Sequence, residues 1–207
     1  MNATLFETSE PKIHNQSRPC LIYLHSHSGS QMEAADVVRQ AICINFAVCT
    51  FDFAGYGKSE GSYGTLGKNE ATDTHTIVEY LVSKEKYRYI YLWGRSMGAA
   101  ATIRYCSQLA GEFIKGIVLD SPFSDAKTMI ADVLAEGNVP RFVTSLCLLP
   151  ISSTLMEKTG VDVLDNSPLE LAPGIKVPAF VMVGNQDTLT KPERVRNIYQ
   201  ALTCNKI

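Results

Sequence analysis

Residues 89–101 read YIYLWGRSMGAAA, and this stretch carries the strongest structural signal in the chain. Residues 89–93 form a continuous apolar run, which is typical of a buried parallel strand. The pentad Gly-Arg-Ser-Met-Gly at 94–98 follows at once, and small residues open a helix directly behind it. A strand, a sharp turn and a helix form the context that Gly-x-Ser-x-Gly needs if its serine is to stand above a sheet. The sequence therefore predicts that Ser96 occupies a strained turn between a strand and a helix.

Two interpretations of Ser96 follow from this pattern. A serine hydroxyl raised on such a turn is a nucleophile, and the N–H of Met97 then points toward the place where an oxyanion would form. The alternative is an ordinary helix N-cap serine with glycine neighbours. The flanking strand and helix favour the nucleophile.

The rest of the chain repeats the alternation of short apolar runs and amphipathic stretches. The expected strands are 21–24, 46–51, 89–93, 116–119 and 178–183, and the expected helices are 31–44, 69–82, 96–109 and 192–202. Continuous apolar runs that alternate with helices predict an α/β fold with a doubly wound, mostly parallel sheet. In such folds the functional site forms at the carboxyl ends of the strands.

The domain organisation is simple, since 207 residues are enough for one domain with a substantial core. We expect residues 1–18 to be an N-terminal tail. The stretch 126–173 breaks the alternation and contains four prolines. We interpret it as a small cap inserted over the sheet.

A polar loop, LHSHSGS at 24–30, follows the first expected strand. Hydrolases with a Gly-x-Ser-x-Gly turn place a second oxyanion-binding N–H in this loop, and by position it belongs to the backbone of His27. The alternative is a polar turn whose histidines only hydrogen-bond to the backbone. For the side chain of His25 we favour that alternative.

An acidic residue, Asp187, ends the stretch VMVGNQD at 181–187, just past the last expected strand. In a Ser-His-Asp catalytic triad of this kind, the acid lies at this position and orients the histidine. The alternative is a turn or cap residue, which is common after strands. With Ser96 upstream the acid is favoured, and Asp120 is a weaker candidate for the same role.

Composition narrows the classes of partner and compartment. Nineteen basic residues stand against 21 acidic ones, and the absence of a basic run argues against nucleic acid as a partner. The N-terminus does not resemble a signal peptide, and no apolar run is long enough to span a membrane. The six cysteines show no metal-ligand spacing. We expect a cytoplasmic protein with no cofactor and no metal.

Taken together, four blocks resemble the α/β-hydrolase superfamily, in particular its prolyl-oligopeptidase-like and serine-aminopeptidase-like hydrolases. The blocks are residues 19–29, 51–61, 92–99 and 119–125. The resemblance implies that Ser96 is the catalytic nucleophile and Asp187 the acid. It also implies that the backbone N–H groups of Met97 and His27 form the oxyanion hole.

The chain departs from the family pattern in its histidines. The family's catalytic histidine follows one further strand, whereas the four histidines here, at 14, 25, 27 and 75, all precede Ser96. We therefore expect the sheet to lack its last strand and the chain to be incomplete. In addition, Ser26 stands where the family usually has glycine, which narrows the oxyanion pocket.

Two functions are consistent with these features. The first is a serine hydrolase that cleaves an ester, thioester or amide bond of a small-molecule, lipid or peptide substrate through an acyl-enzyme on Ser96. The second is a non-catalytic binding protein that keeps the α/β-hydrolase fold and its pocket.

Overall fold

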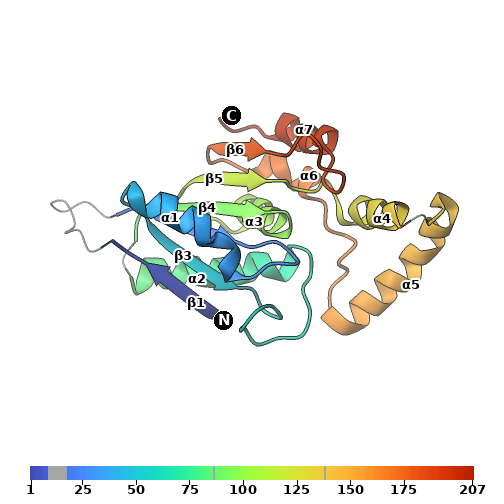
Figure 1. Ribbon diagram of the computed structural model, residues 1–207, viewed down its shortest axis with the longest axis horizontal. Helices are drawn as coiled ribbons and strands as arrows, with labels where there is room; N and C mark the ends of the chain where they lie inside the picture. The colour runs from blue at the N-terminus through green and yellow to red at the C-terminus, as the bar shows by residue number, and fades with distance from the viewer. Residues whose placement is uncertain (9–17, 86, 138) are drawn as a thin grey trace.

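The computed structural model describes residues 1–8, 18–85, 87–137 and 139–207. Its centre is a six-stranded sheet with the order β1-β3-β2-β4-β5-β6 (Figure 1). The strands are β1 (Asn2–Phe6), β2 (Cys20–Leu24), β3 (Ala47–Asp52), β4 (Ile90–Arg95), β5 (Ile114–Asp120) and β6 (Ala179–Met182). Strands β2 to β6 are parallel, and β1 pairs antiparallel with β3. The mostly parallel α/β sheet predicted from the apolar runs is confirmed.

Helices connect the strands. They are η1 (Gln31–Ala34), α1 (Ala35–Cys43), α2 (Lys68–Ser83), α3 (Met97–Gln108), α4 (Ala126–Glu136), α5 (Arg141–Thr159), α6 (Pro168–Leu171), η2 (Ala172–Gly174) and α7 (Pro192–Ala201). The stretch 31–44, expected as one helix, divides into η1 and α1. None of the helices in the described ranges is both long and apolar enough to cross a bilayer.

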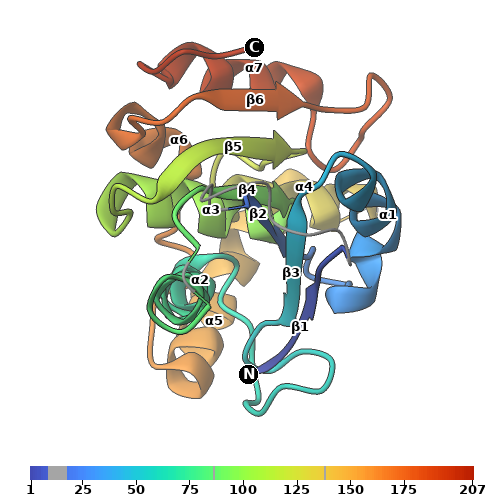
Figure 2. The ribbon, with the colours of Figure 1, turned by 90° about the vertical axis from the view of Figure 1, so that its left-hand side faces the viewer.

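The helices lie on both faces of the sheet, as a doubly wound fold requires (Figure 2). The largest apolar cluster joins α2, α3 and α7 to one face, with Leu81, Ile103 and Ile198 buried against the strands. On the other face α1 packs over β2, β3 and β4, and Trp93 contributes to that smaller cluster. Both faces therefore have an apolar layer, which explains why the strands read as continuous apolar runs.

The prediction of an N-terminal tail is wrong for residues 2–6, because these residues form β1. This strand pairs with β3 in a register that runs from Asn2 opposite Asp52 to Phe6 opposite Val48. It is an edge strand with partly exposed side chains, so its sequence carries no continuous apolar run. Backbone pairing with β3 creates this strand, and a local pattern does not reveal such pairing. Residues 9–17 of the expected tail lie outside the described residues.

At the opposite edge, β6 is the last strand of the described part of the chain, and the C-terminal residues add to it. The N–H of Ala179 donates to the carbonyl of Asn205 at 2.9 Å, and the N–H of Val181 donates to that of Ile207 at 2.9 Å. Ala179 and Lys206 form a parallel bridge. Residues 205–207 thus continue the sheet beyond β6.

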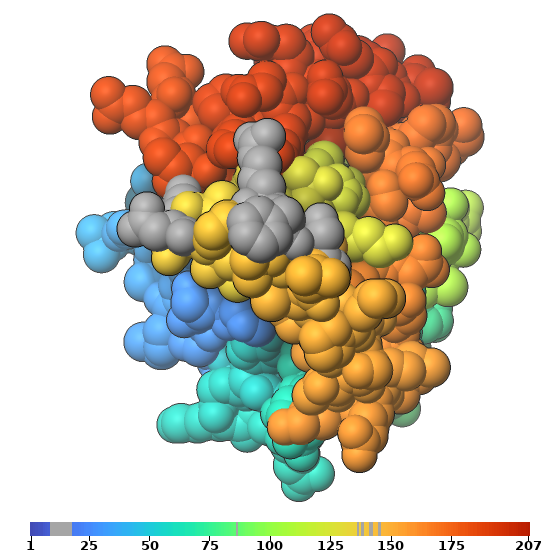
Figure 3. All heavy atoms as spheres, turned by 90° about the vertical axis from the view of Figure 1, so that its right-hand side faces the viewer, coloured from blue at the N-terminus to red at the C-terminus, as the bar shows by residue number. Residues whose placement is uncertain are grey.

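The segment 126–173 leaves the sheet with α4 and α5 and returns toward it with α6 and η2, where Ala172 is buried in the largest apolar cluster. Its helices α4 and α5 extend from the edge at which the strands end (Figure 1). Figure 3 shows this segment, in yellow and orange, across one face of the molecule, between the blue and teal loops and the red C-terminal part. Large apolar side chains on α5 are solvent-exposed, with Leu146 at 70% and Leu149 at 77% exposure. That this segment acts as a cap stays a prediction.

Candidate active site

The turn between β4 and α3 has the strained geometry that the sequence predicts. Ser96 has φ of 50° and ψ of −109°, a conformation that is uncommon for residues with a side chain. The neighbouring glycines are required because the turn is tightly packed. A Cβ on Gly94 would come within 2.3 Å of the carbonyl oxygen of Gly98, and a Cβ on Gly98 within 2.0 Å of that of Leu24.

Ser96 does not behave as a helix cap. Among the described residues its side chain accepts no capping hydrogen bond from α3. Its backbone N–H instead donates to the carbonyl oxygen of Asp120 at the end of β5, at 2.8 Å. The N-cap interpretation therefore lacks the contact that defines it, and the hydroxyl is left available at the strand ends.

The polar loop after β2 is held rigidly at Ser26. Its N–H donates to Oε2 of Glu33 at 2.8 Å. Its carbonyl oxygen accepts from the N–H of Gly29 at 3.0 Å and from Nδ1 of His25 at 2.7 Å. The carbonyl of Ser26 and the N–H of His27 belong to one planar trans peptide and point in opposite directions. Fixing the carbonyl therefore fixes the direction of the His27 N–H.

His25 has the backbone-binding role that the sequence favours. Its ring is fully buried, and Nε2 accepts from the N–H of Phe53 at 3.2 Å. Nδ1 therefore carries the proton and donates to the carbonyl of Ser26. Burial lowers the pKa of His25 below its usual value of 6.5, which keeps the ring neutral.

A residue that sequence reasoning missed, Tyr56, joins the two predicted oxyanion donors. Its hydroxyl lies 2.6 Å from Nδ1 of His27 and 3.2 Å from Sδ of Met97. Because a phenol has a single proton, both contacts are satisfied when His27 donates to Tyr56 and Tyr56 donates to the sulfur. The only sequence signal was the loop FAGYG at 53–57, which belongs to the block 51–61 that resembles the α/β-hydrolase superfamily.

Asp187 lies in the loop after β6, and its carboxylate is well hydrogen-bonded. Oδ1 accepts from the N–H groups of Leu189 at 3.0 Å and Thr190 at 2.8 Å, and Oδ2 accepts from the Thr190 hydroxyl at 2.5 Å. Burial acts to raise the pKa of Asp187, but hydrogen bonds from Thr190, Leu189 and Ser121 outweigh it and lower that pKa. The turn-forming role that the sequence left open is present, and it leaves the carboxylate ionised.

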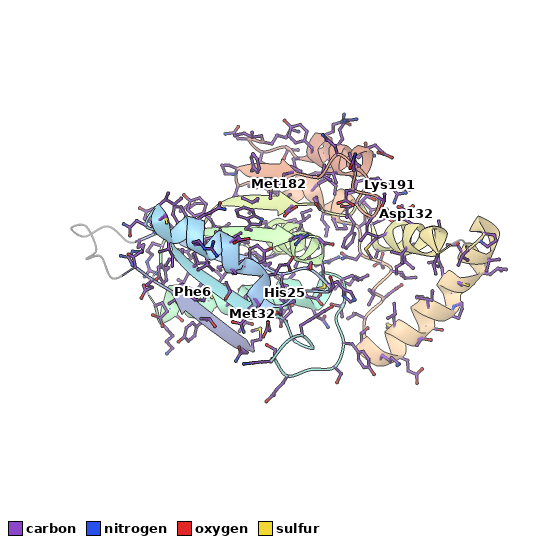
Figure 4. All side chains as sticks on the ribbon, in the orientation of Figure 1. Phe6, His25, Met32, Asp132, Met182 and Lys191 are labelled. Atoms are coloured by element: carbon purple, nitrogen blue, oxygen red, sulfur yellow. The ribbon has the colours of Figure 1, made fainter. Side chains whose placement is uncertain are left out.

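Hydrogen bonds across the sheet bring Ser96 and Asp187 to the same edge. Ser96 is tied to Asp120, and the N–H of Ser121 donates to the carbonyl of Met182 at 2.8 Å. Ser121 in turn helps to lower the pKa of Asp187, although its hydroxyl donates to Oδ1 of Asp120 at 3.0 Å. Figure 4 shows Met182, at the end of β6, at the same edge as His25, which follows β2.

The three described histidines have partners other than Ser96 and Asp187. His25 is bonded to backbone, His27 to Tyr56, and His75 on α2 lies with its ring 6.1 Å from that of Tyr105. Within the described ranges, none of the three has a hydrogen bond to Ser96 or Asp187, and no cluster of three or more metal ligands occurs. His14 lies outside the described residues. The predicted site residues in the described ranges are thus the hydroxyl of Ser96, the backbone N–H groups of Met97 and His27 and the carboxylate of Asp187.

Comparison with known sequences identifies relatives. The family model described as serine aminopeptidase, S33 matches residues 16–168. Protein bem46 of Schizosaccharomyces pombe is 31% identical over 139 residues, which cover 63% of this chain and 44% of that protein. Human monoglyceride lipase is 31% identical over 163 residues, which cover 73% of this chain and 51% of that protein. The chain thus spans about half the length of these curated relatives.

Solved structures share the fold. The esterase Pf2001 of Pyrococcus furiosus superposes with a TM-score of 0.72 at 27% identity, over 92% of this chain and 73% of that one. A monoacylglycerol lipase of Paleococcus ferrophilus matches with a TM-score of 0.67 at 19% identity, over 100% of this chain and 89% of that one. From the matching family model and the shared α/β-hydrolase fold, we conclude that the chain belongs to the serine aminopeptidase S33 family.

Proposed function

We propose that this chain carries the nucleophile of a serine hydrolase that cleaves an ester, thioester or amide bond through an acyl-enzyme on Ser96. One observation carries the proposal. Ser96 stands on a strained turn at the carboxyl end of β4, and its side chain is not used to cap α3. Strain at a non-glycine residue persists where the surrounding structure enforces it, and it is concentrated at functional sites.

In the proposed reaction the Ser96 oxygen attacks the carbonyl carbon of the substrate, and the hydroxyl proton passes to a base. The oxyanion of the tetrahedral intermediate accepts hydrogen bonds from the N–H groups of Met97 and His27. Collapse expels the alcohol, thiol or amine, which takes up the proton, and leaves Ser96 acylated. Water then attacks the acyl group and releases the acid. Tyr56 links the two donor residues through their side chains.

The base would be a histidine oriented by Asp187, whose ionised carboxylate stabilises the imidazolium. His25 is excluded from this role by its burial and its two backbone bonds. His27 is tied to Tyr56, and His75 lies on α2 beside Tyr105. We therefore propose that the base is a histidine other than these three described ones.

Esters of small molecules or lipids are the favoured substrates. Monoglyceride lipase and the Pf2001 esterase, by their names, act on esters, and this chain shares 31% and 27% identity with them. The exposed apolar side chains of α5 suit an acyl chain as a binding partner. Peptide substrates remain the alternative within the same chemistry.

Covalent labelling tests the proposal. A fluorophosphonate probe should modify the natural protein at Ser96, and mass spectrometry of the labelled peptide identifies the site. Ser96→Ala should abolish labelling, whereas the control Ser62→Ala, at an exposed loop position, should not change it. A panel of p-nitrophenyl esters of increasing acyl length then ranks the substrates. A folded natural protein that hydrolyses no ester and is not labelled would favour the non-catalytic binding protein.

A further inference from the structure

Glu33, in η1, joins the polar loop to the residue that precedes Ser96. Its Oε2 accepts from the N–H of Ser26 at 2.8 Å, and its Oε1 accepts from Nη1 of Arg95 at 2.6 Å. Ser26 directly precedes His27 in the chain, and Arg95 directly precedes Ser96. One carboxylate thus bridges the immediate neighbours of the predicted nucleophile and of one predicted oxyanion donor.

We propose that the Glu33–Arg95 pair is a positioning device that sets the distance and orientation of the His27 N–H relative to the Ser96 hydroxyl. This inference rests on the proposed function, because the position of that N–H matters only if an oxyanion forms beside it. Neither residue touches the substrate. They act through the backbone of the loop and of the turn.

The packing around Glu33 is close enough to transmit position. The side chain of Glu33 is only 14% exposed. A Cβ on Gly29 would come within 2.2 Å of its Oε2, so the loop closes over the carboxylate. A hydrogen bond from a backbone N–H to a carboxylate is charge-assisted and stronger than one between neutral groups. The peptide N–H of Ser26 therefore has little freedom to turn.

Arg95 connects this carboxylate to the turn. Its Nε lies 4.0 Å from Oδ2 of Asp120, the residue whose carbonyl accepts from the N–H of Ser96. The guanidinium thus spans from η1 to the end of β5, beside the nucleophile. Its side chain is 51% exposed, so the ion pair adds little to global stability. A positioning role therefore predicts an effect on turnover that exceeds the effect on unfolding.

Kinetics of the natural protein on a p-nitrophenyl ester test the role. Glu33→Ala removes both contacts, and kcat should fall about 10- to 100-fold, because small misplacements in an active site have effects of this size. KM should stay within about twofold, since the ester is not bound by Glu33. Glu33→Gln keeps an oxygen for the Ser26 N–H and should recover part of kcat, and Arg95→Lys should recover more than Arg95→Met. The matched control is Asp36→Asn, which breaks the exposed Arg39–Asp36 pair of α1 and should change nothing.

Amide hydrogen exchange separates this inference from the proposed function. In Glu33→Ala, the peptide that covers residues 24–30 should exchange about tenfold faster than in wild type, and Asp36→Asn should leave it unchanged. If the wild type is inactive but the peptide of residues 24–30 exchanges faster in Glu33→Ala, the proposed function fails, whereas the positioning of this loop by Glu33 is supported. If Glu33→Ala keeps the wild-type kcat, or the exchange of this peptide is unaltered, the positioning role is overturned.

Discussion

Helix α3 and helix α5 belong to the same chain but are held in very different ways. Nine of the 12 residues of α3 are buried, and the helix begins directly at the strained turn of Ser96. The longer α5 contains Pro150 and exposes Leu146 and Leu149 to solvent. The proposed chemistry thus belongs to a closely packed part of the molecule, whereas helix α5 of the proposed cap presents large apolar side chains to solvent.

The two helices have different requirements for precise positioning. A nucleophile and its oxyanion donors must be held within fractions of an ångström, and tightly packed elements provide that. A surface that selects acyl chains gains from exposed apolar side chains. The segment 126–173 is joined to the core near Asp187 by ion pairs of Asp132 with Lys191, at 3.1 Å, and with Arg194 (Figure 4).

The largest effect should come from Ser96→Ala, which removes the proposed nucleophile. We expect kcat/KM for a p-nitrophenyl ester to fall at least about a thousandfold. The free energy of unfolding should remain nearly unchanged, because the side chain caps nothing in α3. A companion variant, Ser96→Gly, should be equally inactive but more stable by about 1 kcal/mol, because glycine adopts the positive φ without strain. Retained activity in either variant would contradict the mechanism.

The next effect contrasts the two helices directly. Ile103 is fully buried on α3, and Ile103→Ala should lower the free energy of unfolding by about 2–5 kcal/mol. Leu149 on α5 is 77% exposed, and Leu149→Ala should change the free energy of unfolding by less than about 0.5 kcal/mol. Urea denaturation measures both. Similar losses for the two variants would mean that α5 is packed as firmly as α3.

A smaller loss of stability should follow from Gly98→Ala. The added Cβ would meet the carbonyl of Leu24 at 2.0 Å, which forces α3 away from β2 and should cost about 1–3 kcal/mol. Gly111 provides the matched control, because a Cβ there meets no described atom within 4 Å. Gly111→Ala should leave the thermal midpoint almost unchanged. Equal effects at both positions would argue against close packing at the turn.

The smallest effect should be a pH dependence caused by His25. Its pKa is lowered in the folded protein by burial, so below pH 6.5 the unfolded chain binds a proton that the folded chain does not. Stability should therefore rise with pH up to about 6.5, by at most about 1.4 kcal/mol per pH unit. His25→Ala should be less stable overall, with a shallower slope between pH 5 and 6.5. The lowered pKa values of Asp52 and Asp187 act only at lower pH, because their usual value is 3.8.

Much of the fold could be predicted because buried strands and amphipathic helices leave periodic signals. The apolar runs at 21–24 and 89–93 correspond to β2 and β4, and the helix expected at 192–202 corresponds to α7. Strand β1 left no such signal, because an exposed edge strand depends on pairing with β3. The supporting residues Glu33 and Tyr56 were missed for a similar reason. Their partners lie 7 to 62 residues away in the chain, and nothing local marks them.

The sequence by itself determined the turn at Ser96. The apolar run, the glycines at 94 and 98 and the small residues behind them are local signals of a strand, a turn and a helix, and a Cβ on Gly94 would meet the carbonyl of Gly98 only four residues away. Only the tertiary structure decided what surrounds that turn. Asp120 at the end of β5, Glu33 in η1 and Tyr56 after β3 reach it through the parallel order of the strands. Hydrogen bonds between such distant segments form only once the sheet has brought its carboxyl ends to one edge.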